Sequence, residues 1–383
     1  MPPSPTQNLN ATRTDREETT RLFGLDLLRA AAILLVLTAH TLPGGSTFPI
    51  IPTIAAVSGY LGVELFFVLS GFLIGGILIR MLQRGELGTF AGVWEFWKRR
   101  WFRTVPNYAI FLVFNLAWAA KFGSVSIVSY WNYLFFSQNL GWPCPVFFQE
   151  SWSLAVEEWF YLVFPVFVVG FTVWNRKPSR FGLVLLLMLI LPFGLRCLGW
   201  IEGSWDETIR KVVIYRLDSM MIGVAAAYLA ATHAHWWKKA ERLWPVGMVL
   251  LLGVAIHLIR FQPLDSTFWY NRALPTLLTS FATALLLPAL VTIRTQNHYI
   301  AKTVRHISLW SYSLYLCHTP VIRLLQYVCT EIIPFAPYKN PIIRCLLIWV
   351  IAFATAALIY RLWEKPMTQL RDRKPAATGT PPR

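Results

Sequence analysis

Residues 25–40 read LDLLRAAAILLVLTAH, an apolar run with an arginine near one end and a histidine at the other. Ionisable side chains are costly at membrane depth and are usually there for function. Arg29 and His40 are separated by eleven positions, and a helix rises about 1.5 Å per residue, so the two side chains would lie roughly 16 Å apart along its axis. We therefore expect one near each face of a membrane, an arrangement suited to a reaction conducted across it.

The whole chain has the composition of a membrane protein. Of its 383 residues, 56% are hydrophobic and only 14% are charged, which is outside the range of soluble domains. Apolar runs close to the ~20 residues that a spanning helix needs occur at 25–42, 60–80, 104–120, 154–174, 181–200, 213–232, 244–260, 273–293, 307–329 and 341–362. We expect an all-α polytopic membrane protein with about ten transmembrane helices.

Basic residues are concentrated in alternate connections between these runs. Because cytoplasmic loops retain Lys and Arg, this asymmetry predicts that both termini are inside. The formal charge of +16 is spread over successive loops, so it indicates topology and not nucleic-acid binding. Residues 1–21 and 367–383 are predicted to be disordered cytoplasmic tails, and residues 22–366 the transmembrane domain.

Five cysteines show no metal-ligand spacing, so we expect no metal. Cys144 lies in a predicted outer loop and could pair with another cysteine if that side is oxidising. Three connections are long enough to carry a binding surface: 81–103, 121–153 and 196–215.

His40 is the candidate general base. The unperturbed pKa of imidazole, about 6.5, suits removal of a proton from a hydroxyl near neutral pH, although a histidine at a helix end can also simply bind water. Glu64, Glu157, Arg216 and Asp218 are predicted at the same outer depth. We expect Glu157 to support the imidazole and the others to line an acceptor pocket, unless Arg216 and Asp218 only form structural ion pairs.

Glu157 and Glu158 cannot both face one site, because adjacent residues on a helix point about 100° apart. Glu157 shares a helix face with Ser153 and Tyr161, whereas Glu158 lies between leucines on its own face. We expect Glu157 to face the pocket.

A basic cluster is predicted at the inner side. Arg100 and Arg103, at i and i+3, share one helix face and could bind a phosphate bidentately, and Arg29 is predicted at the same depth. Retention of positive charge on the inner side explains the same residues without any ligand. His318, near the middle of the ninth run, is a further candidate for the acceptor pocket, or could only hold helices together.

Seven stretches in this order resemble the acyltransferase-3 family of bacterial integral-membrane O-acyltransferases, from about Arg21 to Pro366. They are LDLLR at 25–29 with His40 after it; GVELFFVLSGFLI at 62–74; RWFR at 100–103 with Pro106; SWSLAVEEWFY at 151–161; RLD at 216–218; YSLYLCHTP at 312–320; and EKP at 364–366. The extra extracytoplasmic hydrolase-like domain of some relatives is not expected here.

The resemblance implies a bacterial inner-membrane enzyme. Cytoplasmic acyl-CoA, such as acetyl-CoA, would be the co-substrate, with no bound cofactor, and would dock on Arg29, Arg100 and Arg103. His40 would serve a carbohydrate or glycolipid acceptor near the outer face. A transporter or flippase could use the same buried charges, and a membrane-bound O-acyltransferase of another class would use His318 as the base.

Overall fold

The computed structural model describes residues 22–42, 50–123, 130–173, 181–199, 204–261 and 268–371. Helices dominate these segments, and none of them contains a strand. The all-α prediction is therefore confirmed. The tail predicted over residues 1–21 lies outside the described residues, as does the part of the C-terminal tail from 372 onward.

The predicted apolar runs fall largely on helices. These are α2 (Phe23–Thr41), α3 (Ile50–Gln83), α4 (Phe90–Phe122), α6 (Ser151–Val168), α7 (Phe181–Leu198), α8 (Leu217–Thr232), α10 (Trp244–Phe261), α11 (Trp269–Thr292), α12 (His298–Tyr327) and α13 (Pro341–Ile359). Shorter helices are α5 (Trp131–Leu134), α9 (Ala234–Ala240) and α14 (Lys365–Arg371).

Seven candidate spans in the described segments are long and apolar enough to cross a bilayer, and the chain is accordingly a multi-pass membrane protein. Length and composition do not confirm the expected number of about ten. α8 has only 16 residues, while α4 and α12 are long but too polar to qualify. Some of the polar residues of α4 and α12, such as Arg103 and His318, line the pockets described below, so hydropathy alone is a poor guide to these two helices.

Residues 367–371 continue α14, so the predicted C-terminal tail begins five residues too early. Thr368 Oγ1 donates a hydrogen bond to the carbonyl of Glu364 at 3.1 Å. Arg371 Nη1 reaches the carbonyl of Arg99 on α4 at 3.5 Å. Polar composition therefore did not prevent helix formation here, because the helix is anchored to a neighbour.

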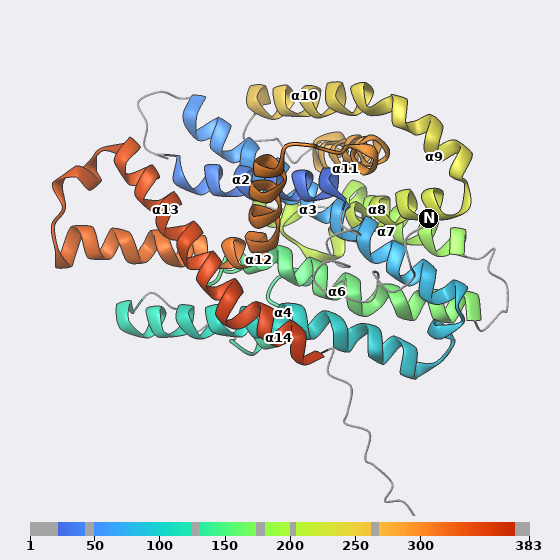
Figure 1. Ribbon diagram of the computed structural model, residues 1–383, viewed down its shortest axis with the longest axis horizontal. Helices are drawn as coiled ribbons and strands as arrows, with labels where there is room; N and C mark the ends of the chain where they lie inside the picture. The colour runs from blue at the N-terminus through green and yellow to red at the C-terminus, as the bar shows by residue number, and fades with distance from the viewer. Residues whose placement is uncertain are drawn as a thin grey trace, which may run out of the picture.

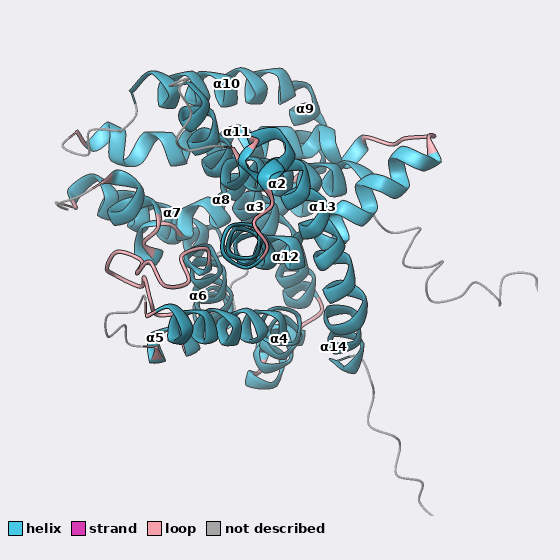
Figure 2. Ribbon diagram, turned by 90° about the vertical axis from the view of Figure 1, so that its left-hand side faces the viewer, coloured by secondary structure: helices cyan, strands magenta, loops and turns pink. Residues whose placement is uncertain are grey.

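Helix α3 is the centre of the bundle. It lies between α10 on one side and α4 with α14 on the other in both ribbon views (Figures 1 and 2). α3 and α8 pack closely because glycines allow their backbones to approach. A Cβ atom at Gly71 would lie 1.9 Å from the carbonyl oxygen of Met220, and one at Gly223 would lie 2.1 Å from that of Val68.

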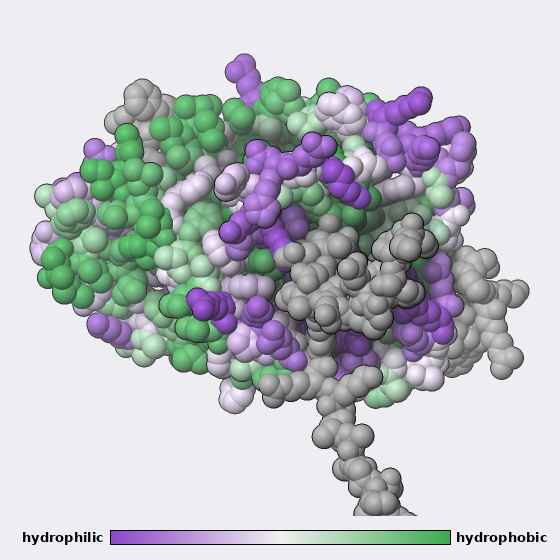
Figure 3. Space-filling model, viewed as in Figure 1, coloured by the Kyte–Doolittle hydropathy of each residue, from purple (hydrophilic) through white to green (hydrophobic). Residues whose placement is uncertain are grey.

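The surface is divided between apolar and polar regions. Figure 3 shows apolar side chains over the end of the molecule where α13 lies and hydrophilic ones around α9 at the opposite end. On α13 the exposed apolar side chains include Ile342, Leu346 and Val350. Such a continuous apolar surface is expected where lipid is the solvent.

Candidate active site

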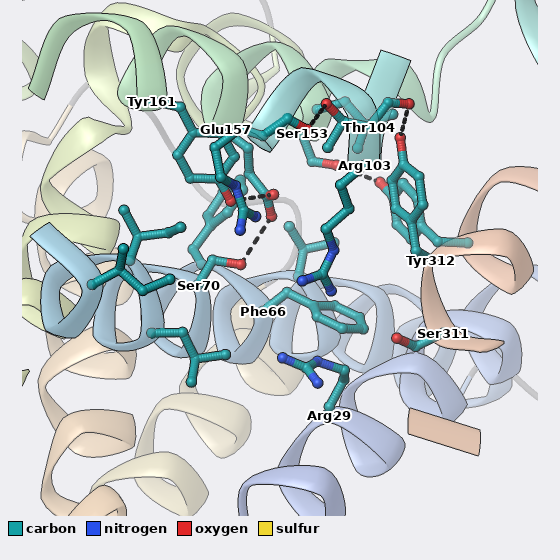
Figure 4. A pocket seen from close by; sticks show the side chains of 18 of the residues that line it. Arg29, Phe66, Ser70, Arg103, Thr104, Ser153, Glu157, Tyr161, Ser311 and Tyr312 are labelled. Carbon is teal, nitrogen blue, oxygen red and sulfur yellow. Dashed lines mark hydrogen bonds between the residues drawn. The ribbon is translucent and has the colours of Figure 1, made fainter. Parts of the chain in front are cut away.

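Four basic side chains from three helices line one pocket, which we call the arginine pocket: Arg29 of α2, Arg80 of α3, and Arg100 and Arg103 of α4. Its cavity volume is about 290 Å³, at the lower end of the range for small-molecule sites. Figure 4 shows Arg103 reaching into the pocket from one side and Arg29 from the other. Glu157 is the only acidic residue among the described residues that line the pocket, so the pocket favours a polyanionic ligand.

Arg100 and Arg103 share this pocket, as their spacing predicts. The guanidinium carbon of Arg100 lies 4.7 Å from the centre of the Tyr161 ring, and its Nε is buried without a hydrogen-bond partner among the described residues. No hydrogen bond or ion pair of Arg103 is found within the described segments, although the charges of Glu364 and Glu157 act on it. Both forks are thus available for charge-assisted hydrogen bonds to phosphate oxygens.

Arg29 is held from the side of α12. Its guanidinium lies 3.7 Å from Asp26 Oδ1 and donates to Ser308 Oγ at 3.3 Å. Ser308 in turn donates to Asp26 Oδ1 at 2.5 Å. This small network fixes Arg29 at the wall of the arginine pocket.

Glu157 lines the arginine pocket and not the pocket of His40, which corrects the predicted pairing of Glu157 with His40. The Glu157 carboxylate accepts hydrogen bonds from Ser70 Oγ at 3.3 Å and Tyr161 Oη at 2.9 Å. The error was one of depth. Glu157 lies six residues beyond Ser151, the first residue of α6, which is roughly 9 Å along the axis.

Glu158 is buried on another face of α6. It lines a separate, mainly apolar pocket against α4, together with Trp101 and Tyr108. The expected inequality of the two glutamates is therefore present in the geometry, because their side chains enter different pockets.

His40 and His318 meet in a second pocket, which we call the histidine pocket. Their ring centres are 4.7 Å apart at an interplanar angle of 65°. His40, from the last turn of α2, is exposed, whereas His318 of α12 is buried, with 1% of its surface accessible. The sequence placed His318 near mid-membrane; the structure places it beside His40.

The hydrogen bonds of the two histidines determine their tautomers. His40 Nδ1 lies 2.9 Å from the carbonyl oxygen of Val36, and His318 Nδ1 lies 2.6 Å from that of Tyr315. A carbonyl oxygen can only accept a hydrogen bond, so each neutral ring carries its proton on Nδ1. Nε2 of each ring then retains its lone pair, which is the form that a general base requires.

Several lining residues of the histidine pocket were not singled out by the sequence analysis. They are Gln149, Glu150 and Trp152 before and within α6, Trp205, Asp206, Arg210 and Lys211 before α8, and Arg323 of α12. The available signal was loop length, since the connections 121–153 and 196–215 were predicted to carry binding surface. Length alone did not identify which of their residues would face His40.

Three residues predicted for the acceptor pocket lie elsewhere. Arg216 forms an ion pair with Glu64 of α3, and Asp218 accepts hydrogen bonds from Arg196 of α7 at 2.9 and 2.5 Å. At most 1% of any of these four residues is accessible. Glu64, Arg216 and Asp218 thus serve in buried ion pairs, because their helix faces are turned toward neighbouring helices.

The two pockets adjoin. Val63 of α3 and Tyr315 of α12 line both of them, while Arg29 and His40 mark the two ends of the same helix, α2. A long ligand bound by phosphate groups in the arginine pocket could therefore present its other end to the histidines.

The described part of the chain contains no group of three or more acidic, histidine or cysteine side chains that could bind a metal ion. All five cysteines are free, including Cys144, so the possible disulfide of Cys144 is absent from the structure. Burial raises the pKa of the Cys144 thiol to about 12, which makes it a poor nucleophile at neutral pH.

Residues 22–361 match the model of the acyltransferase-3 family, described as an acyltransferase domain. The chain belongs to this family. Its curated relatives include the peptidoglycan O-acetyltransferase OatA of Listeria monocytogenes, 26% identical over 93% of this chain and 57% of the relative. O-acetyltransferase OatA of Staphylococcus aureus is 28% identical over 90% of this chain and 57% of the relative.

A putative peptidoglycan O-acetyltransferase of Bacillus subtilis, YrhL, is 26% identical over 90% of this chain and 54% of its own length. The chain thus spans about half the length of the curated relatives it matches. No solved structure matches it.

Proposed function

We propose that this protein transfers an acyl group, acetyl in the simplest case, from cytoplasmic acyl-CoA to a hydroxyl of a cell-envelope carbohydrate or glycolipid. The acceptor would be used near the outer face of the bacterial inner membrane. The observation that carries this proposal is the adjoining arrangement of a basic pocket and a histidine pocket along α2. The names of the relatives, which refer to peptidoglycan O-acetylation, support the acceptor class.

The arginine pocket is suited to the donor. Arg29, Arg100 and Arg103 would bind the phosphates of CoA by charge-assisted hydrogen bonds, and the pantetheine arm would pass between Val63 and Tyr315. The thioester would then lie beside His40. The donor would bind from the cytoplasmic side and the acceptor from the outer side, so neither substrate would have to cross the bilayer. Each substrate would therefore have its own pocket.

His40 would act as the general base. Its Nε2 removes the proton of the acceptor hydroxyl as the hydroxyl oxygen attacks the thioester carbonyl carbon. The carbon–sulfur bond then breaks, and the CoA thiolate takes the proton back from the imidazolium. His318, 4.7 Å away between ring centres, would contact the same acceptor, and Glu157 would contribute to the donor site.

The test is single turnover with labelled acetyl-CoA in proteoliposomes that enclose a carbohydrate acceptor. His40→Ala should lower the rate roughly 10² to 10⁴-fold. The matched control is His306→Ala, because His306 makes the same contact to a carbonyl four residues earlier, at 2.7 Å, but lines neither pocket. Retention of more than about a tenth of the wild-type rate in His40→Ala would exclude His40 as the base.

The same experiment separates the rival functions. A transporter would move label across the membrane without forming an acylated product. If His318 is the general base instead, His318→Ala should abolish acyl transfer, while His40→Ala should transfer the acyl group at a nearly normal rate.

A further inference from the structure

Three buried side chains in the wall of the histidine pocket each have a polar atom without a hydrogen-bond partner in the described part of the chain. The atoms are Arg210 Nη1, Glu150 Oε1 and His318 Nε2. Their residues are 8%, 6% and 1% accessible. An unsatisfied buried polar group costs free energy, so three of them around one cavity indicate a site that a polar ligand completes.

Arg210 is held rigidly for such a contact. Its Nε donates to Asp206 Oδ1 at 2.5 Å, and its guanidinium carbon lies 4.9 Å from the Trp152 ring centre and 5.8 Å from that of Tyr60. One edge of the fork is therefore used, while Nη1 is left without a partner. A planar guanidinium held in this way matches a carboxylate or phosphate group.

The charges of the pocket also favour an anion. Arg210, Lys211 and Arg323 line it together with the acids Glu150 and Asp206. Asp206 is shared by two cations, since Lys211 Nζ lies 2.7 Å from Asp206 Oδ2. Lys211 Nζ also lies 2.8 Å from Glu207 Oε1, so the excess of cations over carboxylates is small. The preference for an anion therefore rests on Arg210 Nη1, which has no partner among the described residues.

We propose that the acceptor is an acidic carbohydrate, one that carries a carboxylate or phosphate group close to the hydroxyl that faces His40. Arg210 Nη1 binds the anionic group, and Glu150 accepts a hydrogen bond from a second sugar hydroxyl. Trp152 and Tyr60 give the sugar ring an aromatic wall. This inference deepens the proposed function and rests on the histidine pocket being the acceptor site.

The first test needs no variant. Equilibrium dialysis of the purified protein, without donor, measures the binding of radiolabelled methyl glucuronide, glucose 6-phosphate and the neutral methyl glucoside. At least one anionic probe should bind tenfold or more tighter than methyl glucoside. Preference for the glucuronide identifies a carboxylate, and preference for the sugar phosphate identifies a phosphate. Equal binding of all three probes, or no measurable binding of either anionic probe, overturns the proposal.

The second test locates the site. Arg210→Gln should abolish the preference for the anionic probe. Glu150→Ala removes the acceptor and should weaken the binding of all three probes. Arg260→Gln should change nothing, since Arg260 is an exposed cation at the end of α10. Arg210→Lys is the second variant if the Gln variant does not fold, and it should lose most of the preference with the fork. A preference that survives in the Arg210 variants but disappears in Arg103→Gln places the anion in the arginine pocket and refutes the proposal.

Failure of the inference and failure of the proposed function give different results. If acyl transfer occurs but neutral and acidic acceptors are acylated equally well, only the inference fails. If the acidic probes bind through Arg210 but no acyl transfer from acetyl-CoA is found, the recognition site stands and the proposed reaction fails.

Discussion

Buried arginines occupy two regions of this molecule, and the two regions differ in how their charge is met. Between α3, α7 and α8, Arg216 pairs with Glu64 and Arg196 pairs with Asp218. In the arginine pocket, Arg100 and Arg103 have no ion pair among the described residues. The same side chain is thus part of the scaffold where a carboxylate neutralises it, and a candidate ligand contact where a cavity lies in front of it.

The largest effect on stability is expected when a paired arginine is removed. Arg216→Ala leaves Glu64 buried without a counter-charge, and loss of one partner of a buried pair costs about 3–5 kcal/mol. We expect a large loss of thermal stability in detergent and a low yield of folded protein. The double variant Arg216→Met with Glu64→Gln should recover most of the stability. If the Arg216→Ala protein is stable but binds the acceptor poorly, Arg216 contributes to the acceptor site and not to the scaffold.

The converse change removes an unpaired arginine. Arg100→Ala and Arg103→Ala should each weaken CoA binding by roughly 10- to 100-fold, since a charged hydrogen bond contributes about 1.5–3 kcal/mol, and should leave thermal stability nearly unchanged. Calorimetric titration with CoA measures the effect. Lysine should restore little, because the bidentate fork is lost. Full affinity in the Lys variants would mean that these residues only anchor the topology.

Glu157 is the carboxylate that lines the arginine pocket among the described residues. Glu157→Gln keeps a hydrogen-bond acceptor for Tyr161 and Ser70 but removes the negative charge that competes with donor phosphates. We expect a several-fold change in the KM for acetyl-CoA, about 1 kcal/mol or less, with little change in the pH profile of kcat. Glu158→Gln is the control and should be nearly silent. A clear shift of the pH profile of kcat in Glu157→Gln would indicate that Glu157 acts on His40, in contradiction to the structure.

The smallest effect is expected at Asp206, a partly exposed partner of Arg210 and Lys211. Burial acts to raise the pKa of Asp206, but these two cations outweigh it and hold the pKa below its ordinary value. The carboxylate therefore stabilises the folded state above the unfolded-state pKa of about 3.9, and this contribution is lost as the pH falls through the lower folded-state pKa.

Asp206→Asn should accordingly lower thermal stability by an amount that is constant between pH 5 and 8 and that shrinks below about pH 4. The loss should be under about 1 kcal/mol, because the Asp206 side chain is 42% exposed and solvent screens the pairs. Melting curves of both proteins over this pH range test it. A difference that grows on acidification would contradict the lowered pKa.

Much of the architecture followed from the amino-acid sequence. Apolar runs of spanning length are set by local composition, so the helices were found without knowledge of their neighbours. The positions of Arg29 and His40 at opposite ends of one helix also required only the helical rise. The spacing of Arg100 and Arg103 placed both on one face in the same way, and the ordered motifs led to the family that the comparisons confirm.

The assignment of polar residues to particular pockets was decided only by the tertiary structure. Glu64, Glu157 and Arg216 were all expected near His40, yet two of them pair across α3 and α8 and one lies among the arginines. The neighbours of a helical residue depend on its depth and on its direction. Glu157 lies six residues beyond the start of α6, roughly 9 Å along the axis, and each further residue turns the side chain by about 100°. Whether a segment forms a helix is determined by its local sequence. Whether a polar residue on that helix forms a buried ion pair or lines a binding site depends on which helix packs against it.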